Sequence, residues 1–402
     1  MKKIFGVVLI AALVLGMAGV AMAAHLEVTG NGAGVRLTGE FRVRGINTNN
    51  ATDADADVDD RQAWIDQRYR LMLDALVGDD VEVKTRFTAA SGMWDGTAST
   101  GTWAVDHAYL VLKAFDSTFY IGRQPASWGN KLLVWGAIKD RFKVVRKAGD
   151  ITYGGFYQKD REDLAPTGGN DQDEFAAFII IPAGDHKVSL LYVMVKDRAG
   201  TGTGTDDSTD GALMDVSYKG KVGPASLMAE FATKTGDLFE TAVDENAPTA
   251  FFIAAGMDLS DAIALSIAYA SAANTYVADG DFAPTLAFGT DVNPTAIQNF
   301  GDSYNASVED DTVSAVVVGA KYKASDALTA GLNVASATLS DDAEVTATEV
   351  DVYATYNLAT NTTLWLGYMH LMTTDMSAND DPITSAAWQI KTSRIHPGIG
   401  AL

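Results

Sequence analysis

The chain lacks cysteine, and after residue 23 it lacks any long apolar run; each absence narrows the choice of fold. Without cysteine among 402 residues, no disulfide can stabilise the molecule. Beyond residue 23, no run approaches the ~18 apolar residues that a membrane helix needs. No Pro-rich tract divides the chain, so we expect one large unit. The five histidines are scattered without the spacing of metal ligands, and we expect neither a metal nor a cofactor.

The first 23 residues have the pattern of an export signal. A cationic start at Lys2 and Lys3 precedes an apolar stretch over residues 4–20, and Ala21 and Ala23 form a small-residue cleavage site. The alternative, a permanent anchor helix, lacks the polar flank that stops transfer. The pattern predicts a cleaved signal peptide over residues 1–23 and an exported domain over residues 24–402.

Charge is unevenly distributed along the chain, whose formal net charge is -22. Residues 25–161 hold 18 basic and 18 acidic residues, whereas residues 162–402 hold 10 basic and 34 acidic ones. This acid excess argues against nucleic-acid binding.

Three early segments alternate between apolar and charged residues with a period of two, over residues 35–45, 65–75 and 81–89. In the first, Phe41 and Val43 share one face while Arg42 and Arg44 share the other. This alternation is typical of strands with one apolar and one polar face.

The connections between such segments alternate in length, which is the most informative feature of the sequence. Short links such as residues 78–80 and 115–117 alternate with long ones such as residues 47–60, 124–140 and 272–311. Nine long and eight short links separate eighteen antiparallel strands, or sixteen if a weak pair merges. A sandwich or propeller does not require this asymmetry, whereas transmembrane barrels have short turns at one end and long loops at the other. The sequence therefore predicts an all-β transmembrane antiparallel barrel.

Three segments in order carry a resemblance to a known family: residues 120–124, the link containing Trp128 and Gly129, and the return strand from Asp140. With the signal and the hairpin asymmetry, the chain resembles Gram-negative outer-membrane porins. The resemblance implies a homotrimer in outer-membrane lipid, with a water-filled channel for passive diffusion of ions and small hydrophilic solutes. It also implies that the third long loop folds inward and faces a wall of arginines.

The loop over residues 124–138 would then pack apolar side chains against the inner wall, and glycines would permit its sharp turns. The candidate constriction residues are Trp128, Lys131, Trp135, Lys139, Arg141 and Lys143, and the candidate pore-wall residues are Arg36, Arg42, Arg44, Arg68, Arg70, Lys84, Arg86 and Arg123. Because this loop contains no acidic residue, we expect a preference for anions. Two alternatives remain: an extracellular loop with an apolar underside, and wall charges neutralised by nearby carboxylates.

Other functions compete with the diffusion channel. A substrate-specific channel for a sugar, carboxylate or phosphate is the main alternative, and a barrel hydrolase using a histidine is another. Residues 30–34 have the wrong glycine spacing for a dinucleotide loop, and the aspartates of residues 53–60 lack the glycine and glutamate of a calcium loop. Because Pro397, Gly398 and Gly400 make a poor strand, we expect residues 388–395 to close the barrel.

Overall fold

In the computed structural model of the chain, all regular structure of the described residues is β-structure. The model describes residues 26–30, 33–50, 61–94, 103–161, 170–199, 208–236, 247–274, 276–288, 300, 312–340, 345–373 and 382–392. Across these ranges, no helix is long and apolar enough to cross a membrane. The predicted signal peptide, the aspartates of residues 53–60 and the chain end after residue 392 lie outside the described residues.

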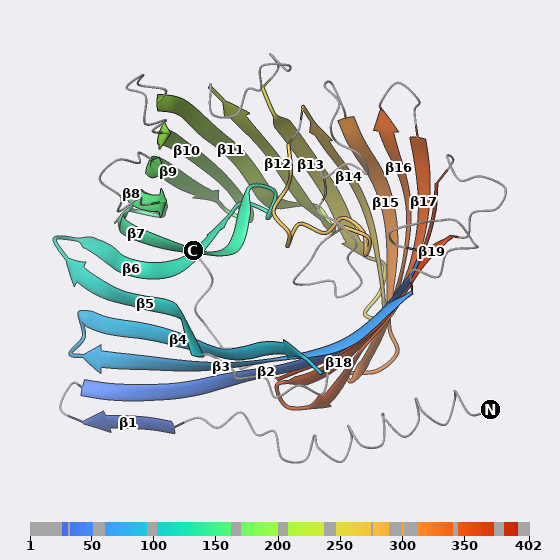
Figure 1. Cartoon of the computed structure of the whole chain (residues 1–402), viewed down its shortest axis with the longest axis horizontal. Helices are drawn as coiled ribbons and strands as arrows, with labels where there is room; N and C mark the ends of the chain where they lie inside the picture. The colour runs from blue at the N-terminus through green and yellow to red at the C-terminus, as the bar shows by residue number, and fades with distance from the viewer. Residues whose placement is uncertain are drawn as a thin grey trace.

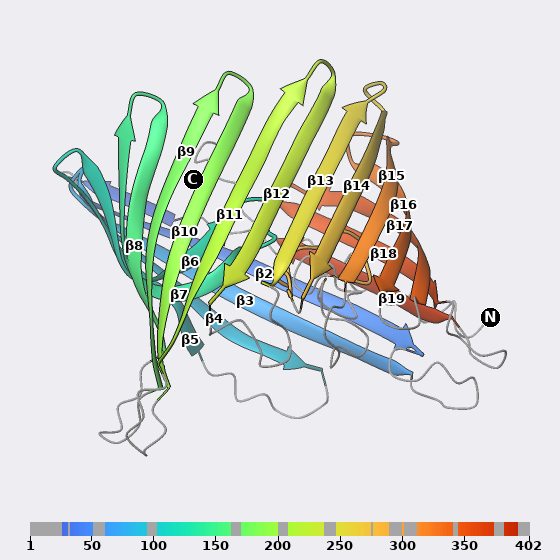
Figure 2. The ribbon, with the colours of Figure 1, turned by 90° about the horizontal axis from the view of Figure 1, so that it is seen from above.

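Consecutive strands form hairpins along the whole described chain. The strands are β1 (Leu26–Gly30), β2 (Ala33–Asn49), β3 (Gln62–Val77), β4 (Val81–Met93), β5 (Trp103–Ala114), β6 (Ser117–Trp128), β7 (Val134–Ala148), β8 (Ile151–Arg161), β9 (Asn170–Ala183), β10 (His186–Ala199), β11 (Ser208–Val222), β12 (Ala225–Thr235), β13 (Thr249–Asp258), β14 (Ile263–Ala273), β15 (Thr312–Lys323), β16 (Leu328–Ser340), β17 (Val345–Ala359), β18 (Thr362–Thr373) and β19 (Ile383–Thr392). Figure 2 shows the short turns that join β7 to β8, β9 to β10, β11 to β12 and β13 to β14 along one rim.

The sheet closes on itself between its last long strand and its first (Figure 1). β19 pairs antiparallel with β2, from Thr384 opposite Asn49 to Thr392 opposite Phe41. β1 pairs with residues 33–37 at the start of β2, and β19 pairs with residues 41–49 of the same strand. The two strands therefore cover different parts of one edge of β2. Of the nineteen described strands, β2 to β19 therefore make a closed ring of eighteen. The sixteen-strand alternative is wrong. The closing strand, Ile383–Thr392, begins before the predicted residues 388–395 and overlaps their first five positions.

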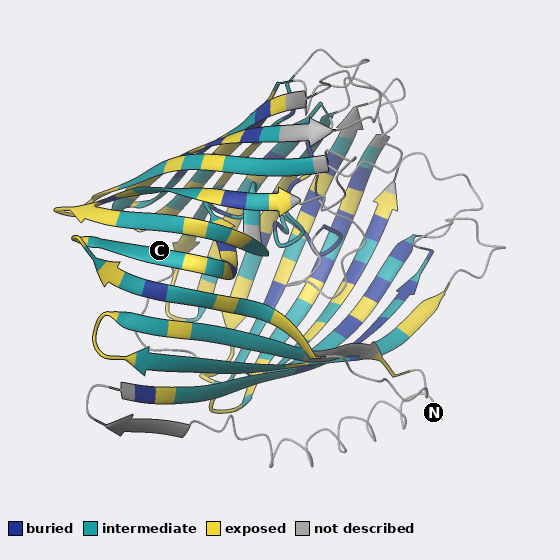
Figure 3. Ribbon diagram, turned by 60° about the vertical axis from the view of Figure 1, so that its left-hand side comes forward, coloured by how far each residue is buried: buried dark blue, intermediate teal, exposed yellow. Residues whose placement is uncertain are grey.

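Side chains alternate between the two faces of the wall, as the bands of colour in Figure 3 show. On β10, Leu191, Val193 and Val195 are buried inside the ring, whereas Tyr192 and Met194 between them are exposed on the outside. Apolar side chains on the outer face suit contact with lipid hydrocarbon, and ring closure pairs the backbone groups that lipid could not satisfy.

The predicted long link over residues 124–140 is wrong in its extent. β6 and β7 stay paired with each other past the point where their pairing with β5 and β8 ends, with Gln124 opposite Lys139 and Trp128 opposite Val134. Only residues 129–133 are left to join them. The glycines, proline and tryptophans obscured the strand pattern in the sequence, but Gly122 and Gly136 take positive φ angles of 116° and 69° within the paired strands and so bend the hairpin without ending it.

Candidate functional site in the barrel lumen

A network of opposite charges lines the inner faces of β2 to β5 and β19, and we call it the charged ladder. Arg44 Nε lies 2.6 Å from Asp66 Oδ2, and Arg86 Nε lies 3.1 Å from Asp106 Oδ2. Its members are Arg36, Arg42, Arg44, Arg68, Arg70, Lys84, Arg86 and Lys391 with Glu40, Asp66, Asp74, Glu82 and Asp106. Eight cations against five carboxylates leave an excess of three positive charges.

The strand register builds this ladder. Arg36 lies directly opposite Asp74, and Arg44 lies opposite Asp66 across the β2–β3 pair. Opposite charges on facing positions stabilise a sheet, and the pairing holds each guanidinium in place. Seven of the eight pore-wall residues that the sequence indicated belong to the ladder. The carboxylates offset part of their charge, as the alternative interpretation expected.

Arg123 does not belong to the ladder, and its predicted place in the pore wall is wrong. Along β5 and β6, Tyr109 lies opposite Gly122, so the alternation places Arg123 on the other face of the sheet. Its side chain is exposed and forms an ion pair with Asp140 at 2.9 Å. The sequence interpretation grouped it with the wall because it stands beside the hairpin bend, without counting its position along the strand.

Residues 128–133, here called the hairpin tip, contact the inner face of the opposite half of the wall. Trp128 Nε1 donates a hydrogen bond to Asp215 Oδ1 of β11 at 2.8 Å. The backbone N–H groups of Asn130 and Leu132 donate to the two carboxylate oxygens of Glu230 on β12, the second at 3.1 Å. Leu132 is fully buried, and Trp128 packs with Leu133 against the apolar inner face of β10.

Gly129 fits the hairpin tip closely to Glu230. Its φ angle is +62°, and a Cβ atom at this position would lie 2.5 Å from Glu230 Oε1. Any other residue would therefore strain the backbone and displace the carboxylate that accepts the tip's N–H groups.

Three cations predicted for a constriction loop lie instead on the wall strand β7. Lys139 forms an ion pair with Asp160 of β8. The Arg141 guanidinium lies 4.8 Å from the centre of the Phe156 ring, and the Lys143 ammonium lies 4.4 Å from that of Tyr120. Of the remaining predicted residues, Lys131 lies in the tip at a φ angle of +86°, and the side chain of Trp135 lies outside the described atoms.

A second segment inside the ring, residues 276–288, escaped the sequence analysis; we call it the lumen segment. Tyr276, Phe282 and Phe288 are buried at 1%, 3% and 4% exposure, in one cluster with alanines on the inner faces of β12 to β17. The sequence carried a signal for it: the inner face of these later strands is lined by alanine, which leaves room for a packed segment.

Two carboxylates of β17 hold the lumen segment in place. The backbone N–H of Leu286 donates to Asp351 Oδ2 at 3.2 Å, and that of Ala287 donates to Glu349 Oε1 at 2.9 Å. Both acidic residues are almost completely buried, at 0% and 3% exposure. Their position within an otherwise apolar and small-residue inner face distinguishes them from the ladder.

The hairpin tip and the lumen segment contact each other. Tyr276 donates its hydroxyl proton to the Leu132 carbonyl oxygen at 3.3 Å, and the Asp279 backbone N–H lies 3.3 Å from the same oxygen. Burial raises the pKa of Tyr276 well above its ordinary value, so this hydroxyl remains a donor. Lys234 of β12 lies over the Tyr276 ring, 4.6 Å from its centre.

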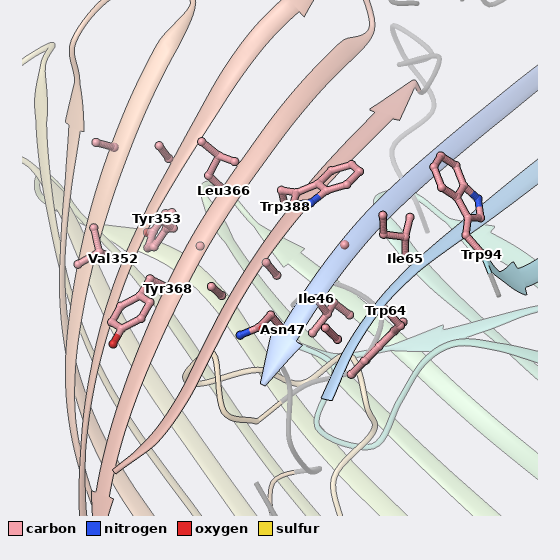
Figure 4. Close-up of a pocket in the computed structure, with 17 residues that line it drawn as sticks. Ile46, Asn47, Trp64, Ile65, Trp94, Val352, Tyr353, Leu366, Tyr368 and Trp388 are labelled. Atoms are coloured by element: carbon pink, nitrogen blue, oxygen red, sulfur yellow. The ribbon is translucent and has the colours of Figure 1, made fainter. Parts of the chain in front are cut away.

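The outer wall carries a hollow of about 800 Å³ at the seam of the barrel (Figure 4). Trp388 of β19 lies across Gly45 of β2, where an added Cβ atom would be 2.4 Å from the indole Nε1. Leu366 and Ile65 stand on the neighbouring strands at the same level, and Gly45 lies on the face opposite the ladder. The hollow is therefore separate from the lumen.

Within the described residues, no group of three or more His, Asp or Glu side chains could hold a metal ion. The histidines with contacts have other partners: His186 Nδ1 lies 2.7 Å from the Tyr218 hydroxyl, and the His107 ring lies edge-on to Tyr109 with centres 6.2 Å apart. Both of these contacts join a histidine to a tyrosine.

Comparisons with known proteins found a matching family profile and similar solved structures. The sequence profile described as Gram-negative porin matches residues 9–376. The anion-selective porin from Comamonas acidovorans superposes with a TM-score of 0.50 at 12% identity, covering 90% of this chain and 99% of its own. The outer-membrane channel DcaP of Acinetobacter baumannii gives 0.44 at 15% identity, covering 90% and 97%. A search among curated protein sequences found no match.

Proposed function

Because the chain belongs to the Gram-negative porin family, and is therefore an outer-membrane channel for passive diffusion, we propose that its channel prefers anions. The single observation that carries the proposal is the charged ladder, with its excess of three cations. A fixed positive excess along a narrow water-filled passage raises the local concentration of anions and lowers that of cations.

The acidic excess of the later part of the chain acts against this preference. The ladder outweighs it because the ladder charges lie closer to the permeating ions. At ~0.15 M salt the Debye length is ~8 Å, so carboxylates on loops at the pore mouth are largely screened from ions inside the barrel. Ladder charges act on every passing ion at close range. The wall displaces part of the surrounding water, which lowers the effective dielectric constant and strengthens the interaction. Lys139, Arg141 and Lys143 on β7 add to the positive side, with Asp160 as partner of the first.

The proposed solutes are small hydrophilic anions in general. Guanidinium groups suit carboxylates and phosphates because both accept paired hydrogen bonds, so these anions are the first candidates for a preferred substrate. A sugar-specific channel has no comparable support in the charged ladder.

The test is a current measurement on purified protein in a planar lipid bilayer. Stepwise conductance shows that the protein forms channels, and the zero-current potential under a KCl gradient gives the sign of the selectivity. We expect the sign that corresponds to chloride permeating faster than potassium. A cation-selective channel contradicts the proposed preference while leaving the channel itself intact.

We further propose that the channel assembles as a homotrimer through the outer wall around the seam. The hollow beside Trp388 supports this proposal, because a recess of about 800 Å³ in an apolar wall gives a neighbouring subunit a surface to fill. The strand β2, which lies in the charge-balanced early part of the chain, residues 25–161, forms one side of the same seam.

A further inference from the structure

We propose that the lumen segment and the hairpin tip form one constriction body, which sets the size of the channel, and that Glu349 and Asp351 are its positioning residues. The inference rests on the channel function above and adds a second pore-narrowing element, contributed by residues 276–288. The constriction body is defined as residues 128–133 and 276–288.

The first argument is packing. Phe282 meets Phe252 of β13 edge-on with ring centres 5.2 Å apart, and it meets Phe300 at 5.7 Å. Such contacts bury large aromatic surfaces against the wall, and the edge-to-face arrangement of each ring pair adds to the stabilisation. A segment packed in this way stays inside the barrel and occupies volume that solutes could otherwise use.

The second argument is anchoring. Glu349 and Asp351 are buried beside alanines and accept N–H groups from residues 286 and 287. Burial of a carboxyl group is unfavourable unless hydrogen bonds compensate it, and here the lumen segment supplies those bonds. Glu230 and Asp215 hold the hairpin tip by the same means. Two separate segments are thus bound to the inner wall by inward carboxyl groups that take no part in the ladder.

The third argument is the joint between the two segments. The Leu132 carbonyl oxygen accepts from the Tyr276 hydroxyl and lies 3.3 Å from the Asp279 backbone nitrogen. Leu132 itself is fully buried in the same cluster as Phe282. The tip and the lumen segment therefore support each other, and loosening one will loosen the other.

The position of the body defines the path of the solute. The body packs against the inner faces of β9 to β18 and reaches Ile383 of β19, whereas the ladder lies on β2 to β5 with Lys391 of β19. Solutes then pass between a mostly apolar body, whose charged residues are Lys131, Asp279 and Asp281, and a wall of paired charges. Figure 1 shows both inward segments against the green-to-orange side of the ring, opposite the blue strands.

The absence of cysteine allows a direct test by thiol labelling. Val277 of the lumen segment is 39% exposed, so a cysteine there can react with a water-soluble methanethiosulfonate reagent. We expect labelling of Val277→Cys to reduce the single-channel current in discrete steps. Asp326→Cys is the matched control because its fully exposed side chain lies in the β15–β16 turn, away from the lumen; labelling there should leave the current unchanged.

A second variant removes the anchor. In Glu349→Gln with Asp351→Asn, amide groups replace the two carboxyl groups that accept the backbone N–H groups of the lumen segment. Asp326→Asn serves as the control for the loss of a carboxyl group. We expect single-channel conductance to rise above that of the unmodified protein and of the control, since conductance increases with the open cross-section of the pore.

The outcomes separate the two claims. Complete labelling of Val277→Cys without a change in current overturns the constriction body, because a group attached to it would then not obstruct the path. This result can be obtained even if the anchor variant fails to fold. An unmodified protein that forms no channels contradicts the channel function instead and would appear before any variant is measured.

Discussion

Removing three arginines from the charged ladder should abolish the selectivity of the channel. The perturbation is Arg68→Gln, Arg70→Gln and Arg86→Gln in one protein. These side chains pair with Glu40 and Asp106 on the inner face of β2 and β5. The triple variant leaves five cations against five carboxylates, so the positive excess of three falls to zero.

The size of the effect follows from Coulomb's law and screening. For an ion ~8 Å from each charge in water, one charge contributes about 0.5 kcal/mol before screening. With a Debye length of ~8 Å, screening reduces this to about 0.2 kcal/mol. Three charges then favour an anion over a cation by roughly 1.1 kcal/mol, a ratio of about seven. Under a tenfold KCl gradient, such a ratio gives a zero-current potential of ~35 mV.

The assay is the zero-current potential in a planar bilayer, measured for the unmodified protein and for variants at equal salt. Arg123→Ala is the matched control, because this arginine is exposed on the other face of the sheet and pairs with Asp140. We expect the triple variant to lose about 35 mV and the control to lose almost nothing, since only ladder charges line the path.

The opposite change should strengthen the preference. Glu40→Gln with Asp106→Asn raises the excess from three to five positive charges, and the same arithmetic gives ~50 mV. A triple variant that keeps the original potential, or a charge-neutralised pair that shifts it toward cations, would refute the claim that the ladder is the selectivity filter.

Two further predictions concern the tip and the assembly. Gly129→Ala should lower the thermal midpoint of barrel unfolding more than Gly78→Ala does. Both glycines have positive φ angles, so either replacement costs about 1–2 kcal/mol of backbone strain. Only at position 129 would the added Cβ atom also collide with Glu230. Equal midpoints in heat-dependent gel mobility would argue against close contact at the tip. For the homotrimer, native mass spectrometry in detergent should give three copies, and Trp388→Ala should weaken them; a monomeric species alone contradicts the assembly without touching the channel.

The strands could be predicted from the sequence because their signal is local. Alternation along residues 35–45 assigned Phe41 to the outer face and Arg42 to the inner one, and cross-strand pairing keeps that assignment. Link lengths predicted eighteen strands, because each hairpin ends in either a tight turn or a long loop. The charged ladder could be predicted from the same alternation, because charged side chains on one face of neighbouring strands lie close together.

The site details that the sequence missed depend on contacts between distant segments. Arg123 was misplaced because a bend at Gly122 hides the strand period, which only the pairing with β5 restores. The lumen segment has no regular pattern of its own. Its place is set by Glu349 and Asp351, which follow it by more than 60 residues in the chain. No window of neighbouring residues contains that information.

The inner wall divides into two parts that follow the order of the chain, and this division explains why the constriction is built on one side. Strands β2 to β5 carry long charged side chains inward, which fill space and repel an apolar segment. Strands β12 to β17 carry alanines such as Ala250, Ala270 and Ala315, whose short side chains leave space inside the ring. Water in that space would be in contact with apolar surface, which is unfavourable. Aromatic side chains of the lumen segment occupy that space instead. Because each half is unsuited to the role of the other, the charge-selecting wall and the size-limiting body face each other across the channel, and the two can be altered separately by mutation.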